Sequence, residues 1–226
     1  MPYSDFDTSP ASSERRQLRA NLEYLGLIAP EAGPAELAHL LQARREWGYT
    51  AEELLELDLA ACQRGKERDL QALVMDCDGV LTDGQMIFSK KGDELKHFHA
   101  HDGMGLKRWH QQDKRSGIIS AGRSTGLVER RAAMMKVEQV YVGKIPKWEI
   151  LESWLAQWEL QPRQVAYIGD DLSDLEIMEK VGFSACPADA VPAVRAAVDL
   201  RLQLPGGKGC VRELIDHYLL LENHGG

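Results

Sequence analysis

Two clusters of aspartates follow short apolar runs in this 226-residue chain. The first cluster is Asp76 and Asp78, in LVMDCDGVLTDG, and the second is Asp170, Asp171 and Asp174, in YIGDDLSDLEIM. Carboxylates held a few ångströms apart repel or take up protons unless a cation neutralises them. Hard oxygen ligands of this type suit Mg²⁺, which usually keeps part of its water shell and also binds substrate phosphate. We therefore expect one cation site if the two clusters meet in the fold.

The elements that must position these clusters alternate in type after about residue 70. Apolar runs predict strands, and the amphipathic stretches between them predict helices. This alternation is typical of a parallel sheet flanked by helices, whose ligands bind at the carboxyl ends of the strands. The first and last predicted strands end at the two aspartate clusters. The predicted strands are 71–76, 116–120, 138–142 and 164–168, and the predicted helices are about 104–112, 124–136, 147–159 and 173–180.

A β-hairpin is predicted directly after the first strand. The stretch QMIFSKKGDELKHFHAHDG has two strand-like arms around Lys91-Gly92-Asp93. Its second arm carries His97, His99 and His101, which would share one face of a strand. Three readings stay open: a transition-metal site, a substrate contact by His101, or a solvated or interface face.

Two further segments offer groups that suit a phosphate. In IISAGRS (118–124) a predicted strand ends in a hydroxyl and a glycine at the start of a helix, where backbone N–H groups bind anions. Lys147 begins the next predicted helix, where a cation would offset phosphate and carboxylate charge. Lys144 is a rival for this role, and a solvated surface lysine is the plain alternative for either position.

Some candidate residues have simpler structural readings. Asp174 lies inside a possible capping box, Ser173–Glu176, so it can serve the helix start alone, and either Asp171 or Asp174 can support a ligand instead of binding a cation. Met104 and Trp109 are expected to pack. A helical face is also expected to lie in the core: Ile150, Leu151, Trp154, Leu155 and Trp158.

The first 69 residues contain only helix signals and no candidate catalytic cluster. Leu18, Leu22, Leu25 and Ile28 share one helical face in SERRQLRANLEYLGLI. Pro34 can begin a second helix, PAELAHLLQARREW, and a Thr50–Glu53 capping box precedes a third, LLELDLAACQ. We expect 1–69 to be a helical appendage that packs or docks and 70–226 to be the functional domain.

Composition excludes several classes of protein. The net charge of −8 and the pI near 5.4 argue against a nucleic-acid binder, which would carry a basic face. No apolar stretch approaches the roughly 20 residues of a membrane helix, and the first residues do not resemble a signal peptide. Four widely spaced cysteines predict free thiols in a reducing cytoplasm: Cys62, Cys77, Cys186 and Cys210.

Six landmarks in order give the chain from about 70 to 222 a family resemblance. It resembles the haloacid dehalogenase-type phosphatases, and within them the capless branch that includes 3-deoxy-D-manno-octulosonate 8-phosphate phosphatase and the nonulosonate 9-phosphate phosphatases. The fold implied is a Rossmann-like α/β sheet with an inserted hairpin. The landmarks are DCDGVLTDG at 76–84, Asp102-Gly103-Met104-Gly105 after the hairpin, the hydroxyl–glycine strand end, Lys147, Gly169-Asp170-Asp171 with Asp174, and the tail GGKGCVRE at 206–213.

The resemblance implies a mechanism and an assembly. Asp76 would be the nucleophile that forms an aspartyl-phosphate, Asp78 the general acid and then base, and Lys147 the group that steadies both nucleophile and phosphate. Mg²⁺ would be held by Asp76, the Asp78 carbonyl and Asp170. Members of this branch form tetramers in which the hairpins meet centrally and a neighbour's tail can close each active site. The implied substrate contacts are Ser120, Ala121, Gly122, Arg123, His101, Asp102, Lys208 and Arg212.

The second motif departs from the branch pattern, which usually reads [TS]-G-R. Here it is Ser120-Ala121-Gly122-Arg123, so counting back from Gly-Arg places Ala121 where the hydroxyl belongs. Counting along the strand places Ser120 there with one extra residue, and we favour Ser120.

The expected function is a Mg²⁺-dependent phosphomonoesterase acting on a small acidic sugar phosphate. One rival is a phosphatase of another metabolite, because the helical appendage could redirect specificity. A second rival is a non-catalytic assembly domain, like the phosphatase-like tails of some sugar-activating cytidylyltransferases. Intact Asp76, Asp78, Lys147 and Asp170 argue against the second rival.

Overall fold

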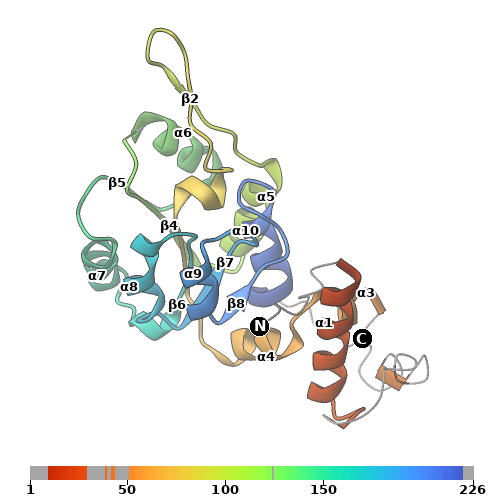
Figure 1. The fold of residues 1–226 in the computed structure, drawn as a ribbon. Coiled ribbons are helices and arrows are strands. Elements are labelled where there is room, and N and C mark those ends of the chain that lie inside the picture. The colour runs from red at the N-terminus through yellow and green to blue at the C-terminus, as the bar shows by residue number, and fades with distance from the viewer. Residues whose placement is uncertain (1–9, 30–38, 40–41, 44–50, 124, 221–226) are drawn as a thin grey trace, which may run out of the picture. The chain divides into compact units, whose positions relative to one another are not determined.

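The computed structural model describes residues 10–29, 39, 42–43, 51–123 and 125–220, and the chain divides into two compact units (Figure 1). The boundary lies between Arg64 and Gly65, inside helix α4 (Leu59–Glu67). It therefore falls a few residues before the change in sequence character near residue 70.

The larger unit, which begins at Gly65, contains a six-stranded parallel sheet in the order β5-β4-β1-β6-β7-β8. The four predicted strands are confirmed, and β1 lies between β4 and β6 in the middle of the sheet. The strands over Phe183–Cys186 and Leu200–Arg201 and the short helix over Pro192–Ala197 were not predicted, because their apolar runs are too brief to show a period. The strands are β1 (Ala72–Met75), β4 (Arg115–Ser120), β5 (Gln139–Val142), β6 (Val165–Ile168), β7 (Phe183–Cys186) and β8 (Leu200–Arg201).

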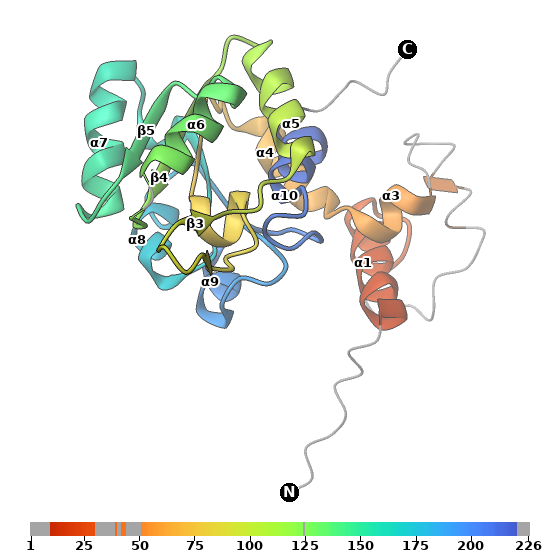
Figure 2. The same ribbon diagram turned by 90° about the horizontal axis from the view of Figure 1, so that it is seen from above.

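Helices cover both faces of this sheet (Figure 2). Helices α7, α8 and α9 share one apolar cluster with the sheet, whereas α5, α6 and α10 pack together on the other face. The helices are α5 (Ala100–His110), α6 (Thr125–Met135), α7 (Lys147–Trp158), α8 (Leu175–Met178), α9 (Pro192–Ala197) and α10 (Cys210–Glu213), which continues as a helical turn over Leu214–Leu219.

Helix α7 is fixed on the sheet by its tryptophans. Trp154 and Trp158 are 5% and 4% exposed, which confirms their predicted core position. A side chain at Gly117 of β4 would lie 2.4 Å from the Trp154 ring, so only glycine allows this close approach. This packing brings Lys147, the first residue of α7, to the carboxyl end of the strands. Trp109 is fully buried as expected, but Met104 is 52% exposed, so its predicted packing is wrong for the chain by itself.

The predicted hairpin is confirmed and projects from the sheet unit in Figure 1. Its strands β2 (Ile87–Phe88) and β3 (Glu94–Leu95) are antiparallel, and the Ser89 hydroxyl donates a 2.8 Å hydrogen bond to Asp93 across the turn. Four large apolar side chains on the hairpin are exposed: Met86, Ile87, Phe88 and Leu95.

The smaller unit contains α1 (Pro10–Tyr24), α3 (Ala51–Glu56) and most of α4. Leu22 and Ile28 are buried with Leu54 and Leu59, and Leu18 and Leu25 pack against them, so the predicted helical face is confirmed. Of the predicted helix over 34–47 the structure describes only residues 39, 42 and 43, which are helical, and the capping residue Thr50 lies outside the described residues.

The expected continuous helix over LLELDLAACQ is interrupted, and a buried asparagine on α1 accounts for the interruption. The Asn21 amide donates to the carbonyls of Leu54 (2.8 Å) and Leu57 (2.6 Å), and its oxygen accepts the Leu59 N–H (3.1 Å). Asp58 then caps α4 by accepting the Ala61 N–H at 2.9 Å. The side chain of Asn21 thus replaces helical hydrogen bonds at the break.

Two expectations from composition have direct counterparts in the structure. The four cysteines are free and buried. Among the helices that the structure describes, none has both the length and the apolar character needed to cross a membrane.

Candidate active site

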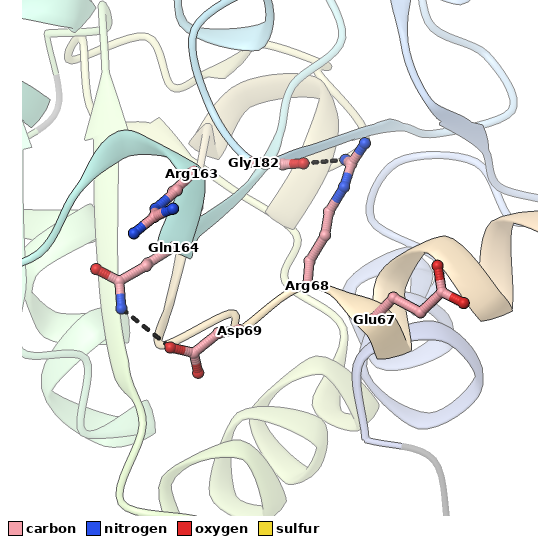
Figure 3. Close-up of a pocket in the computed structure, with 6 residues that line it drawn as sticks. All are labelled: Glu67, Arg68, Asp69, Arg163, Gln164 and Gly182. Carbon is pink, nitrogen blue, oxygen red and sulfur yellow. Dashed lines mark hydrogen bonds between the residues drawn. The ribbon is translucent and has the colours of Figure 1, made fainter.

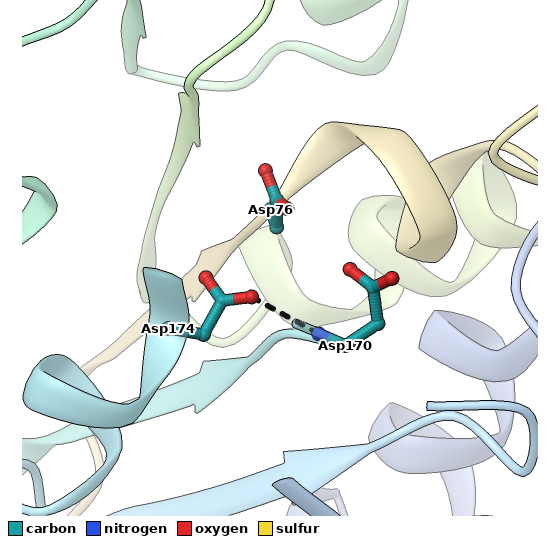
Figure 4. A group of neighbouring side chains, drawn as sticks. All are labelled: Asp76, Asp170 and Asp174. Atoms are coloured by element: carbon teal, nitrogen blue, oxygen red, sulfur yellow. Dashed lines mark hydrogen bonds between the residues drawn. The ribbon is translucent and has the colours of Figure 1, made fainter. Parts of the chain in front are cut away.

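Parallel pairing of β1 with β6 brings the two aspartate clusters together. The Asp76 N–H donates to the Ile168 carbonyl at 2.9 Å, which aligns the ends of the two strands. Carboxylate oxygens of Asp76, Asp170 and Asp174 lie within 4.8 Å of one another (Figure 4). The expected convergence of three carboxylates is therefore present at the carboxyl edge of the sheet.

The arrangement of these carboxylates fits a divalent cation. Burial raises the pKa of Asp76 to about 7, which Lys147 partly opposes, and burial with the charge of Asp174 raises the pKa of Asp170 to about 7. Oxygen Oδ1 of Asp170 is buried and has no hydrogen-bond partner. A cation would satisfy this oxygen and stabilise the ionised form of both groups.

Gly79 makes room beside Asp170. It lies in the helical turn Cys77–Leu81 with φ of 86°, and a Cβ there would lie only 2.1 Å from Asp170 Oδ2. A side chain at this position would both strain the backbone and fill the space next to the carboxylate. The glycine of the D-x-D-G sequence thus keeps this side of the cluster open.

Lys147 is the cation of the cluster. Its side chain is 5% exposed, and Nζ lies 3.1 Å from Asp76 Oδ2 and 2.5 Å from Asp174 Oδ1. Burial alone would lower the pKa of Lys147, but the charges of Asp76 and Asp174 outweigh it and raise the pKa above its ordinary value. The rival Lys144 is exposed, so the structure brings only Lys147 to Asp76.

Asp174 holds the cluster together. It is fully buried, and its two oxygens accept hydrogen bonds from Lys147, from the Tyr167 hydroxyl (2.5 Å) and from the N–H groups of Asp170 and Asp171 (3.1 Å each). Because these donors occupy both oxygens, Asp174 positions Lys147, and Asp76 and Asp170 remain for a cation. The expected Ser173–Glu176 capping box is wrong. The box is Asp171 with Asp174, because the turn begins two residues earlier.

Asp78 is paired with a lysine that the sequence analysis did not single out. Lys96 Nζ lies 2.5 Å from Asp78 Oδ1 and 2.9 Å from Glu94 Oε1, and its side chain is 5% exposed. Asp76 and Asp78 therefore engage different lysines, Lys147 and Lys96. No spacing rule links Lys96 to Asp78, and the only sequence signal is a lysine in the DELKHF arm of the hairpin.

Ser120 is the buried hydroxyl at the end of β4. Its Oγ accepts the Gly122 N–H at 3.1 Å, and the residue is 1% exposed, whereas Ala121 and Arg123 are exposed. A Cβ on Gly122 would lie 3.0 Å from Asp78 Oδ2 and 3.1 Å from Ser120 Oγ. The structure thus brings Ser120, Gly122 and Asp78 together, and leaves Ala121 and Arg123 at the surface.

The glycine loop of the tail packs on the turn that follows Asp76 in the same chain. The Gly207 N–H donates to the Val80 carbonyl at 2.9 Å, and a Cβ on Gly206 would lie 2.0 Å from the Gly79 carbonyl oxygen. Glu213 holds the base of this loop by accepting the N–H groups of Gln203 and Leu204. Lys208, at the tip, is exposed.

Two residues expected to contact substrate have other partners in this chain. Asp102 is fully buried, its Oδ1 accepts the Arg212 N–H at 3.0 Å, and burial raises its pKa to about 6. The Arg212 guanidinium pairs with Asp216. The structure therefore places Asp102 in the contact between α5 and α10.

The three histidines do not converge. His97 is exposed and lies 3.5 Å from Asp83, whereas His99 caps α5 and accepts the His101 N–H at 3.4 Å. Within the described ranges, the Asp76 cluster is the group of metal-ligating residues that comes together. His101 is exposed, which leaves a substrate contact open.

Comparison with known proteins places this geometry in a family. A model described as haloacid dehalogenase-like hydrolase matches residues 105–204. The 3-deoxy-D-manno-octulosonate 8-phosphate phosphatase KdsC of Escherichia coli K12 is 38% identical over 157 residues, which are 70% of this chain and 83% of that protein.

Solved structures agree with the sequence comparison. The crystal structure of the 3-deoxy-D-manno-octulosonate 8-phosphate phosphatase from Yersinia pestis is 36% identical, has a TM-score of 0.67, and the match covers 70% of this chain and 84% of that one. The enzyme from Moraxella catarrhalis, solved with magnesium, phosphate and KDO, is 31% identical with a TM-score of 0.66 and coverage of 70% and 90%. The chain therefore belongs to the haloacid dehalogenase-like hydrolases, as a phosphatase of the capless branch related to the 3-deoxy-D-manno-octulosonate 8-phosphate phosphatases.

Proposed function

We propose that the chain is a Mg²⁺-dependent phosphomonoesterase that works through an aspartyl-phosphate on Asp76. The observation that carries the proposal is a buried carboxylate at a strand end, held by Lys147 and facing a second carboxylate with an unpartnered oxygen. A carboxylate so placed can attack phosphorus, and covalent catalysis divides the displacement into two easier steps.

The residues divide the chemistry between them. In the first step Asp76 attacks phosphorus, the bond to the alcohol oxygen breaks, and protonated Asp78 gives its proton to the leaving oxygen. In the second step the Asp78 carboxylate takes a proton from water, which attacks the aspartyl-phosphate and releases inorganic phosphate. Lys147 offsets the negative charge of Asp76 and of the transferring group throughout. Ser120 and the Gly122 region supply hydrogen bonds to the phosphate.

Mg²⁺ would be held by the carboxylates of Asp76 and Asp170 and by the Asp78 carbonyl. When bound, it supplies positive charge to the oxygens of the transferring phosphoryl group. The choice of Mg²⁺ is supported by the all-oxygen ligands and by the magnesium in the Moraxella catarrhalis structure.

The proposed substrate is a small acidic sugar phosphate of the 3-deoxy-octulosonate 8-phosphate or nonulosonate 9-phosphate type. Support comes from the relatives, whose names specify the first of these. The exposed side chains of His101 and Lys208 offer hydrogen-bond donors to a sugar carboxylate. The buried free thiols suit work in a reducing cytoplasm.

We also propose a homotetramer in which the hairpins meet and the tail loop of one subunit completes the site of its neighbour. The exposed side chains of Met86, Phe88 and Leu95 are an apolar surface for such a contact. The glycine loop also packs on the turn at Gly79 of its own chain. Lys208 therefore has two candidate active sites, that of its own chain and that of a neighbour. Mixing Lys208→Ala with Asp76→Asn chains, after proven subunit exchange, separates the cases. Recovered activity assigns the loop to the neighbour, and no recovery assigns it to its own chain.

A phosphate-release screen tests the function. The purified chain is assayed with p-nitrophenyl phosphate and with a panel of sugar and sugar-acid phosphates, with and without Mg²⁺. The proposal expects Mg²⁺-dependent hydrolysis with the highest kcat/KM on a phosphorylated sugar acid. A preference for another metabolite would support the first rival, and no hydrolysis of any ester would support the non-catalytic assembly domain.

A further inference from the structure

Lys96 is the lysine of the hairpin that turns inward. The hairpin from Gly84 to Asp93 is exposed throughout, including Lys90 and Lys91, and Leu95 next to Lys96 is 56% exposed. The Lys96 side chain is nevertheless only 5% exposed, because it reaches back from the second arm to Asp78. A long side chain loses considerable conformational entropy when it is fixed in this way, so the contact needs a strong compensating interaction.

That interaction consists of two charge-assisted pairs of the Lys96 ammonium group, one with Asp78 and one with Glu94. Lys96 Nζ lies 2.5 Å from Asp78 Oδ1 and 2.9 Å from Glu94 Oε1. The Thr82 hydroxyl approaches the same Asp78 oxygen at 3.5 Å. Glu94 therefore holds Lys96 in place, and Lys96 holds one defined oxygen of Asp78.

The other Asp78 oxygen faces the phosphate-binding segment. Oδ2 lies 3.0 Å from the point where a Cβ on Gly122 would be, beside Ser120 Oγ. Fixing Oδ1 thus removes the freedom of the carboxylate to rotate and leaves Oδ2 on the side where the leaving group departs. A proton transfer of this type needs hydrogen-bond geometry at the moment of reaction, so a carboxylate held in one orientation is an advantage.

We propose that Lys96 is a positioning residue for Asp78, so that the inserted hairpin forms part of the catalytic apparatus. The inference rests on the proposed function, because it assumes that Asp78 protonates the leaving oxygen. Lys96 itself does not touch the reacting atoms in this reading. Its contribution is to hold Oδ1, and Glu94 acts one step further away by holding Lys96.

The test compares two esters of nearly equal size that differ in their need for a proton donor. p-Nitrophenolate leaves readily without a proton, whereas phenolate, from a phenol with a pKa of about 10, benefits more from protonation. We expect Lys96→Met to raise the ratio of kcat/KM for p-nitrophenyl phosphate to that for phenyl phosphate by at least about tenfold. Lys96→Arg, which keeps a charged donor, should return the ratio most of the way to that of the wild type.

The second chemical step gives an independent readout. Because Asp78 also activates water, slow breakdown of the aspartyl-phosphate in Lys96→Met should produce a burst of about one equivalent of p-nitrophenol per chain. Lys91→Met is the matched control, since Lys91 is an exposed lysine of the same hairpin. It should leave the ratio unchanged and show no new burst.

Each outcome decides one question. Equal losses on both esters in a folded Lys96→Met protein, or activity like that of the wild type on both, overturns the positioning role. If Lys96→Met does not fold, Lys96→Gln and Glu94→Gln replace it. The same increase in the kcat/KM ratio of the two esters is expected, and its absence in these variants would also overturn the positioning role. If the wild type hydrolyses neither these two esters nor any sugar phosphate of the panel, or if Asp76→Asn is as active as the wild type, the proposed function itself fails.

Discussion

The two edges of the same sheet carry similar residues and differ in burial. At the carboxyl edge, the neighbouring carboxylates of Asp76 and Asp174 (Figure 4) share Lys147, whose side chain is 5% exposed. At the amino edge, a pocket of about 560 Å³ is also lined by charged and amide groups (Figure 3): Glu67, Arg68, Asp69, Arg163, Gln164 and Gly182. Both edges bring together side chains of opposite charge.

The charges of the amino edge are more exposed than those of the carboxyl edge, and they are paired. Arg68 donates to the Gly182 carbonyl and lies 3.2 Å from Asp199, with the two side chains 35% and 29% exposed. Asp69 accepts the Gln164 amide at 3.2 Å. Exposed pairs of this kind contribute about 1 kcal/mol or less, because water and salt screen them.

At the carboxyl edge, burial makes the charged groups reactive. Its carboxylates are wholly or partly buried, so desolvation raises the pKa values of Asp76 and Asp170 to about 7, and one Asp170 oxygen has no partner. Groups in this condition bind a cation or a phosphoryl group strongly. The following predictions set one edge against the other.

The largest effect is expected from removing the nucleophile. Asp76→Asn should lower kcat at least about 1,000-fold, because an amide cannot attack phosphorus, while the fold is kept. The matched change at the amino edge, Asp69→Asn, should leave kcat within about twofold. Phosphate release by the purified variants measures both. Turnover like that of the wild type in Asp76→Asn would rule out the mechanism.

Removal of metal should have a strong and pH-dependent effect. EDTA should abolish phosphatase activity, and added Mg²⁺ should restore it. Because the folded-state pKa values of Asp76 and Asp170 are raised to about 7, both groups hold protons at lower pH and compete with the cation. In the metal-free protein, stability falls as pH rises from about 4, where the unfolded chain loses these protons, to about 7, where the folded protein loses them.

The competition between protons and Mg²⁺ predicts how the stabilisation by Mg²⁺ depends on pH. The increase in Tm produced by Mg²⁺ should grow from pH 5.5 to pH 8, as recorded by thermal unfolding in matched buffers. Asp170→Asn should remove most of this growth, whereas Asp69→Asn should retain it. An increase in Tm that is independent of pH would contradict a cation held by these two carboxylates.

Asp174→Asn should damage both stability and rate. It removes the charge that pairs with buried Lys147, which costs about 3 kcal/mol of the free energy of unfolding, and it should lower kcat on the order of 100-fold through misplaced Lys147. Arg68→Met breaks a partly exposed pair and should cost about 1 kcal/mol with no change in kcat. Urea unfolding and steady-state kinetics report the two quantities. Equal losses of the free energy of unfolding in Asp174→Asn and Arg68→Met would contradict the difference between the two edges.

A smaller effect is expected from the second motif. Ser120→Ala should raise KM or lower kcat about tenfold, the value of one hydrogen bond to a charged group. Ala121→Ser is the control, and it should be silent because Ala121 is exposed. If Ser120→Ala is silent, backbone N–H groups alone bind the phosphate there.

The smallest effect is expected from removing residues 1–64, which lie outside the sheet unit. The remaining chain should hydrolyse p-nitrophenyl phosphate within about twofold of the full protein. A shorter chain that begins at residue 70 also lacks Gly65, which packs on the Tyr218 carbonyl, and Arg68, so it should unfold at a lower temperature. An inactive chain from residue 65 would show that the helical unit supports catalysis.

Local sequence patterns determined much of this protein. Apolar runs predicted four of the six strands, Lys91-Gly92-Asp93 predicted the hairpin, and two aspartate clusters at strand ends predicted where the carboxylates meet. These inferences succeeded because period, turn chemistry and the geometry of parallel sheets act over short distances or follow from strand order alone.

Only the tertiary structure decided which groups pair. Lys96 meets Asp78 through the folding back of the hairpin, Asp174 proved to hold Lys147, and Asn21 interrupts a helix more than 30 residues away. Each contact joins residues that no spacing rule relates. Such pairings depend on burial and on the exact approach of side chains, which are set when the whole chain packs.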